Sequence, residues 1–368
     1  MMLRRSLLGL ALPAAAWAQA RPKTPPLLYI GAFPGQILIF DEDQEKVIDH
    51  IKLQTGIPRG LTHSWDRKQF YVYTARGGIE VVDPLARRVT NHFTLDSPSH
   101  RVRPSGFAID PQGKVLYTIL RGAVKKIDRF EIDKPKFGVI DLAEKKVTRT
   151  ADLPRDEEAG LGFGADLRVS PDGKYLYAFQ ENVLIFDTAD FKLVEKIELA
   201  KPPYPWMATL NLGFRDDPNE DRGTLTGVFN STDPVVRRSI FGIARFDLNK
   251  RTFEFTPIGP SANNGVMGLQ ITPDRKTGYT VVFQGDTGNR RVEFWVFDMT
   301  TLKVTRRVEF DGPVNFRFTL SGDGKRIYVH GTAPGMEIYD AATLQKRKAV
   351  DMNADLTTNF LLPPRPVS

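Results

Sequence analysis

The sequence predicts an all-β protein that repeats a four-stranded antiparallel unit. Alternating apolar residues flank Asp172-Gly173, and an Asp-Gly pair favours the turn of a β-hairpin. An apolar or aromatic strand ending in Asp then recurs seven times at intervals of 42–60 residues, a period typical of propeller blades. We therefore predict a seven-bladed β-propeller with four-stranded antiparallel blades. The seven strand ends are Ile39-Phe40-Asp41, Val81-Val82-Asp83, Val139-Ile140-Asp141, Ile185-Phe186-Asp187, Arg245-Phe246-Asp247, Val296-Phe297-Asp298 and Ile338-Tyr339-Asp340.

Each of these aspartates is followed by a polar turn and a further alternating strand. Because an Asp side chain bonds backbone amides two residues on, we interpret the seven aspartates as turn formers and not as an ion ring. The expected fourth strands are Lys46 to Leu53, Arg88 to Leu95, Lys145 to Leu153, Lys192 to Leu199, Arg251 to Ile258, Lys303 to Phe310 and Gln345 to Met352.

The first repeat is incomplete, because it begins at Leu27 with what should be its second strand. The stretch Leu356 to Leu362 is a spare strand with no hairpin after it. We expect this C-terminal strand to complete the first blade and to close the ring, which removes the gap between the first and last blades.

Two copies of the hairpin carry a family resemblance. Ser170-Pro171-Asp172-Gly173-Lys174-Tyr175-Leu176-Tyr177 and the stretch Ser321 to Val329 resemble the YVTN-type (YncE-like) seven-bladed propeller repeat. The resemblance covers about the whole mature chain and implies the fold. It implies little about function, because such proteins include binding modules, lactonases and subunits of quinoprotein dehydrogenases.

The N-terminus has the features of an export signal. Arg4-Arg5 precedes the apolar run Leu7 to Trp17, and Ala18-Gln19-Ala20 fits a small-x-small cleavage site. We expect residues 1–20 to be a cleaved signal peptide and residues 21–368 to form a single propeller in the periplasm or outside the cell. The signal resembles the twin-arginine type, with a Sec leader as the alternative.

Composition limits the choice of partners and cofactors. The chain has no Cys, which excludes disulfides, c-type haem attachment and thiolate metal sites. Removal of Arg4 and Arg5 lowers the formal net charge from +7 to +5, weak evidence for a polyanion partner. We expect a monomer with no cofactor, no nucleic-acid partner and no stable membrane anchor.

Antiparallel strand order predicts two different faces. The Asp-Gly turns and the turns after each repeated Asp share one face, here called the turn face. The connections from second to third strand and from blade to blade share the opposite, loop face. Ligands of propellers sit where irregular loops converge, so the loop face is the expected site.

Polar residues at the starts of the inner strands are the candidate ligand-binding residues. Arginines there can hold a carboxylate or phosphate bidentately, and Trp206 offers a ring for stacking. The alternatives are an ion-paired loop surface and a Trp that packs in the core. The candidates are Arg59, Arg103, Trp206, Asn264, Asn315 and Arg317.

Catalytic and metal sites are only weakly indicated. His63 and Asp166 are the candidate general bases on inner strands. Asp217, Asn219 and Asp221 have the spacing of a calcium loop, but Arg222 stands where Gly is expected, so a solvated turn is favoured and no metal is predicted.

These sequence features are compatible with three hypotheses about function. The leading hypothesis is an exported scaffold that binds a protein partner or a small anionic ligand at its loop face, without catalysis. The alternatives are a lactonase-like hydrolase, for which Leu28 to Phe33 resembles phosphogluconolactonase-like proteins, and a non-haem partner subunit of a quinoprotein amine dehydrogenase-like assembly.

Overall fold

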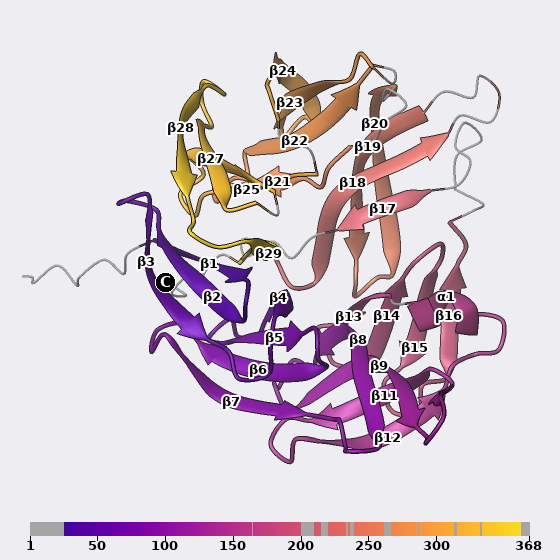
Figure 1. Ribbon diagram of the computed structural model, residues 1–368. Helices are drawn as coiled ribbons and strands as arrows, with labels where there is room; N and C mark the ends of the chain where they lie inside the picture. Colours follow the sequence, from indigo (N-terminus) through magenta and orange to yellow (C-terminus); the bar gives the residue numbers. More distant parts are fainter. Residues whose placement is uncertain are drawn as a thin grey trace, which may run out of the picture.

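The predicted fold class is confirmed. The computed structural model describes residues 26–163, 165–199, 210–214, 220–232, 235, 239–260, 266–285, 288–312, 315–331 and 333–361. Within them, seven antiparallel sheets surround a common axis (Figure 1), six with four strands and one with five. The proposed signal peptide, residues 1–20, and its boundary with the propeller lie outside the described residues.

The first four blades follow the chain, each given from its innermost strand outward. Blade 1 contains β29 (Leu356–Leu361), β1 (Leu27–Ala32), β2 (Gln36–Asp41) and β3 (Lys46–Lys52). Blade 2 contains β4 (Pro58–His63), β5 (Phe70–Thr74), β6 (Gly78–Asp83) and β7 (Arg88–Thr94). Blade 3 contains β8 (His100–Ile109), β9 (Val115–Lys125), β11 (Lys136–Asp141) and β12 (Lys146–Asp152), with β10 (Phe130–Ile132) beside β9. Blade 4 contains β13 (Asp166–Val169), β14 (Tyr175–Phe179), β15 (Val183–Asp187) and β16 (Leu193–Ile197).

The last three blades repeat the same order. Blade 5 contains β17 (Asn211–Phe214), β18 (Thr224–Thr232), β19 (Ser239–Asp247) and β20 (Thr252–Pro260). Blade 6 contains β21 (Gln270–Ile271), β22 (Thr277–Gln284), β23 (Arg291–Asp298) and β24 (Lys303–Glu309). Blade 7 contains β25 (Arg317–Leu320), β26 (Arg326–His330), β27 (Gly335–Asp340) and β28 (Lys346–Asp351). The outer strands match the predicted positions to within two residues.

The C-terminal strand closes the ring as predicted. Strand β29 pairs antiparallel with β1, for example Phe360 with Ile30, and becomes the innermost strand of blade 1. In Figure 1 the indigo N-terminal strands and the yellow C-terminal strands lie side by side at this point. Blade 1 is thus built from both ends of the described chain.

The repeated aspartates form the turns that the sequence predicts. At Asp41, for example, one carboxylate oxygen accepts hydrogen bonds of 2.9 Å from the amides of Asp43 and Gln44. The same contact recurs at the other six aspartates, Asp83, Asp141, Asp187, Asp247, Asp298 and Asp340. Backbone hydrogen bonds of this kind lower the pKa of Asp247, Asp298 and Asp340.

The core lies between neighbouring blades. The described residues form seven clusters of buried apolar side chains, and each cluster joins the facing sheets of two adjacent blades. The cluster that joins blades 7 and 1 contains Phe40 against Tyr328, with ring centroids 5.7 Å apart. Seam-by-seam packing of this kind needs no disulfide and holds the inner strands in fixed positions around the axis.

Two local features were not predicted. The short helix α1 (Glu158–Phe163) precedes blade 4. Blade 3 has unusually long strands, with ten residues in β8 and eleven in β9, and it adds the short strand β10. These strands extend blade 3 at the loop face.

Candidate functional site

Two of the predicted ligand-binding arginines and one unpredicted tyrosine come together at the loop face. Arg59 is the second residue of β4, Arg317 is the first residue of β25, and both side chains are exposed. The charges of both arginines act on the hydroxyl of Tyr73 and oppose the rise in its pKa that burial causes. We call Arg59, Tyr73 and Arg317 the mouth cluster.

Tyr73 reaches the inner strand because its neighbour has no side chain. It lies on β5, where it pairs with Gly60 of β4. A Cβ atom on Gly60 would lie 2.0 Å from Cε1 and 2.7 Å from the hydroxyl oxygen of Tyr73. The other side of the ring stacks on Phe107 of blade 3, with centroids 4.8 Å apart. Packing on both sides fixes the position of the Tyr73 ring and its hydroxyl.

Three inner arginines of the loop face lack an acidic partner within the part of the chain that the structure describes. Among the residues that the structure describes, Arg59, Arg103 and Arg317 make no salt bridge and no side-chain hydrogen bond. By contrast, Arg101 binds Asp96 at 2.6 Å. Guanidinium groups without a carboxylate partner are suited to a bidentate contact with an anion.

Of the remaining loop-face candidates, only Arg103 and Asn315 belong to the described residues. Arg103 is exposed on β8, and its Cγ lies 3.7 Å from the position of a Cβ on Gly77 of blade 2. Asn315 is exposed and takes a left-handed conformation with φ of 54°. Trp206 and Asn264 lie outside the described residues.

The two candidate bases lie at opposite ends of the inner strands. Asp166 begins β13, where its carboxylate pairs with Arg168 at 2.5 Å. His63 ends β4, four residues beyond Arg59, and the rise of a strand places the two roughly 13 Å apart along the axis. His63 is 5% exposed and lines a cavity at the turn face.

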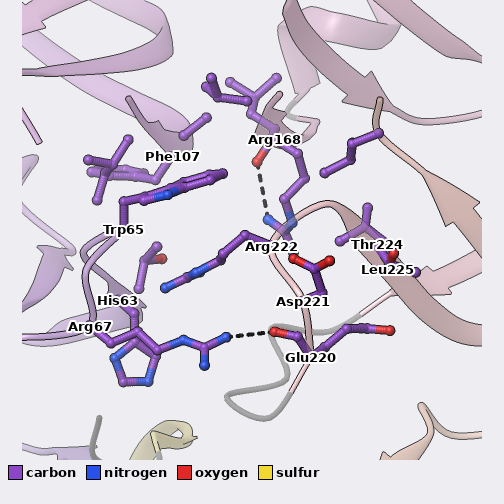
Figure 2. A pocket seen from close by; sticks show the side chains of 16 residues that line it. His63, Trp65, Arg67, Phe107, Arg168, Glu220, Asp221, Arg222, Thr224 and Leu225 are labelled. Atoms are coloured by element: carbon purple, nitrogen blue, oxygen red, sulfur yellow. Dashed lines mark hydrogen bonds between the residues drawn. The ribbon is translucent and has the colours of Figure 1, made fainter. Parts of the chain in front are cut away.

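That cavity, of about 60 Å³, lies between the turn-face ends of β4, β8 and β13 and the start of β18. Figure 2 shows Arg222 beside the ring of Trp65 and Arg67 pointing toward Glu220. The space is enough for a few water molecules and is too small for an organic ligand.

The described part of the turn between β17 and β18 borders the cavity and contacts blade 2. Arg222 donates a hydrogen bond of 2.9 Å to the Ser64 carbonyl, and its guanidinium lies 5.4 Å from the ring centroid of Trp65. In the opposite direction, Arg67 donates to the Glu220 carbonyl at 3.1 Å. Blades 2 and 5 are thus joined across the turn face.

The described part of this turn is solvated only in part: Asp221 is exposed, as expected of a solvated turn, whereas Glu220 is buried. Glu220 is 8% exposed, and its carboxylate accepts hydrogen bonds from Arg275 of blade 6 and from the Thr226 amide. Asp221 lines the cavity, while Asp217 and Asn219 lie outside the described residues. No group of three or more His, Asp or Glu side chains suited to a metal ion occurs within the described ranges.

Sequence reasoning missed Tyr73, Glu220 and Arg222. Tyr73 stands in an alternating strand and has the pattern of a core aromatic residue. The available signal was Gly60 in an inner strand, since a glycine inside a strand often marks a close approach by another group.

Among the described residues, no helix has the length and apolar character that a membrane-spanning segment requires.

Comparisons with known proteins support the fold. No family model and no curated protein sequence matches the chain. The solved structure of dihydro-heme d1 dehydrogenase NirN in complex with DHE is 16% identical, with a TM-score of 0.54 over 96% of this chain and 78% of that one. Apo AztD from Citrobacter koseri is 14% identical, with a TM-score of 0.51 over 91% and 97% of the two chains.

A third structure, the hydrazine synthase of Kuenenia stuttgartiensis, is 18% identical over 87% of this chain and 90% of that one, but its TM-score of 0.46 is too low to support an argument. The membership of the chain in the YVTN-type family stays a prediction. At these identities the comparisons establish a seven-bladed β-propeller that resembles NirN and AztD in fold.

Proposed function

We propose that the protein is an exported β-propeller scaffold that binds a small anionic ligand at the mouth cluster. One observation carries the proposal: Arg59 of blade 2 and Arg317 of blade 7 stand at the starts of the two inner strands that contact β29, and neither has a carboxylate partner among the described residues. The two blades that flank blade 1 thus present positive charge at the same end of the ring, and both charges act on Tyr73.

The chemistry of the cluster favours a carboxylate or a phosphate. Each guanidinium offers a planar pair of N–H donors, and the tyrosine adds an O–H donor whose position is fixed by Gly60 and Phe107. Pre-organised donors lose little conformational entropy when the ligand binds. The exposed Asn359 of β29, the strand between β4 and β25, can add an amide donor.

Export belongs to the same proposal. It rests on Arg4-Arg5, the apolar run Leu7 to Trp17 and the Ala18-Gln19-Ala20 site. Fractionation of cells that express the full chain tests it. A mature periplasmic protein that begins near residue 21 supports export, and a full-length cytoplasmic protein contradicts it.

Ligand binding is tested by calorimetric titration of the mature protein with a panel of dicarboxylates and phosphate monoesters. We expect at least one anion to bind, and Arg59→Ala or Arg317→Ala to weaken it by roughly tenfold or more, because a hydrogen bond to a charged group contributes about 1.5–3 kcal/mol. Arg88→Ala, an exposed arginine on the outer strand of blade 2, is the control. Absence of binding across the panel, or equal loss in the control, contradicts the proposal.

The arrangement of the candidate bases favours binding over lactone hydrolysis. A general base must lie within hydrogen-bonding reach of the attacking water. Asp166 is paired with Arg168, and His63 is at the other end of β4. Turnover of a lactone by the purified protein would overturn the non-catalytic assignment.

A further inference from the structure

Blade 3 bears a groove that its unusual strands create. The groove has a volume of about 900 Å³ and is lined by β8, β9, the segment after β10, β12 and the end of β7. The extended parts of β8 and β9 contribute His100, Val102, Leu120 and Gly122 to its surface. The groove lies on blade 3 beside the outer strand of blade 2, and it includes no residue of the mouth cluster.

A His–Asp pair fixes one end of the groove. Nε2 of His100 lies 2.5 Å from a carboxylate oxygen of Asp133, and the Asp133 amide donates to the Gly122 carbonyl at 3.0 Å. A Cβ on Gly122 would lie 2.0 Å from that carboxylate. The absence of a side chain at Gly122 therefore allows the segment after β10 to lie against β9.

The residues that line the groove carry an excess of positive charge, with four lysines against Asp133 and Asp152. Three of the lysines pair at 3.0–3.6 Å with Asp152 or with Glu144 and Glu158, which do not line the groove. The lysine side chains are 47–75% exposed, and exposed pairs contribute little free energy. Incoming carboxylates can replace them. The lysines are Lys134, Lys136, Lys145 and Lys146.

The groove is also elongated. Its lining follows β12 from Lys146 to Asp152, a run of roughly 20 Å at the rise of a β-strand. A second groove, between blades 4 and 5, is smaller at about 550 Å³ and is balanced in charge, since Glu195 and Glu198 accompany Lys196 and Arg251. Length and positive charge together distinguish the groove on blade 3.

We propose that this groove binds an extended acidic segment of a partner protein. The length of β12 matches a segment of about seven residues, and the lysines along it complement carboxylates. The adjoining β9–β10 hairpin exposes Ile127, Phe130 and Ile132, with exposures of 108%, 60% and 79%. Apolar side chains exposed together typically mark a surface that contacts a protein. The proposal does not depend on the anion site at the mouth cluster.

The test uses the mature protein and a fluorescein-labelled peptide of alternating Glu and Val, about ten residues long. Fluorescence anisotropy should show saturable binding that weakens as salt is added, because the contacts are between exposed charges. Lys136→Gln with Lys146→Gln should weaken it by roughly threefold to tenfold, because each exposed ion pair contributes up to about 1 kcal/mol. The matched control is Lys46→Gln with Lys303→Gln, two exposed lysines that begin the outer strands of blades 1 and 6 as Lys146 begins that of blade 3.

Several outcomes would overturn the proposal. One is no saturable binding of the Glu-Val peptide, and another is equal binding by the two double variants. Binding of free glutarate as tightly as the peptide would assign the groove to a small acid. A dimer in size-exclusion chromatography that the peptide does not dissociate would assign it to a second copy of the chain. Circular dichroism of both double variants checks that they are folded.

Discussion

Glu42 couples the stability of the ring closure to pH. This residue follows Asp41 in blade 1 and is 1% exposed. Its carboxylate accepts hydrogen bonds from the Gly322 amide of blade 7, at 3.1 and 3.2 Å, and from the Tyr328 hydroxyl at 3.0 Å. Burial is the largest influence and raises the pKa of Glu42 from 4.5 to about 7, although these hydrogen bonds and Arg326 oppose the rise.

A raised pKa means that the folded state binds the Glu42 proton more tightly than the unfolded state does. The contribution of this proton to stability is fully present below pH 4.5 and is lost as the pH rises through about 7. A difference of this size between the two pKa values corresponds to about 3 kcal/mol of unfolding free energy. The seam between blades 1 and 7 should therefore be weaker in alkaline solution than in mildly acidic solution.

Glu42→Gln removes the titration and retains the hydrogen-bond acceptor. Urea unfolding, followed by tryptophan fluorescence from pH 4.5 to 8.5, should show that the wild type loses about 3 kcal/mol relative to this variant as the pH rises. Glu181→Gln, an exposed carboxylate in the loop before β15, is the control. A difference between wild type and Glu42→Gln that is constant across the pH range, or that grows in favour of the wild type at high pH, would refute the reasoning.

Two substitutions and one truncation test which contacts stabilise the propeller. Gly60→Ala should displace Tyr73 and lower the unfolding free energy by about 1–3 kcal/mol. Gly335→Ala is the control, because no atom lies within 4 Å of the added Cβ. Equal stability of the two variants in urea unfolding would contradict the packing of Tyr73 over Gly60. Arg222→Ala removes the contact of blade 5 with Ser64 and Trp65 and should lower the unfolding free energy by about 1–3 kcal/mol. Anion affinity at the loop face should not change. A parallel loss of anion affinity in calorimetry would contradict this, because it would show that the turn face and the loop face are coupled. Truncation after Asp355 removes β29, the inner partner of β1, and should abolish cooperative thermal unfolding in circular dichroism. A truncated chain that unfolds as cooperatively as the full chain would show that β29 is not needed for stability.

Much of the fold could be predicted because its determinants are local. Asp41 and its six counterparts bond amides within three residues, so each turn is recognisable from the neighbouring sequence. The closure by β29 followed from counting strands, since Leu27 starts a blade without an inner strand and Leu356 to Leu362 is left over. The extension of blade 3 by β10 could not be counted in this way, because β10 has only three residues.

The mouth cluster could be predicted only in part, because its geometry depends on contacts between strands. Strand order predicted that Arg59 and Arg317 lie near the axis at the loop face. In the structure both residues lie at the start of an inner strand, as predicted. Tyr73 joins them only because the register sets it opposite Gly60. Likewise, the contact of Arg222 with Ser64 spans 158 residues of sequence, so no local pattern could indicate that the blade 5 turn reaches blade 2.

The central claim, that Arg59 and Arg317 hold one anion together, is tested most directly by a double-mutant cycle. The tightest-binding anion of the panel is titrated into the wild type, Arg59→Ala, Arg317→Ala and the double variant. If both arginines contact the same ligand, their effects are coupled, and the double variant should lose less affinity than the product of the two single losses. Independent losses that multiply fully, or affinities unchanged by either substitution, would contradict a shared site at the mouth cluster.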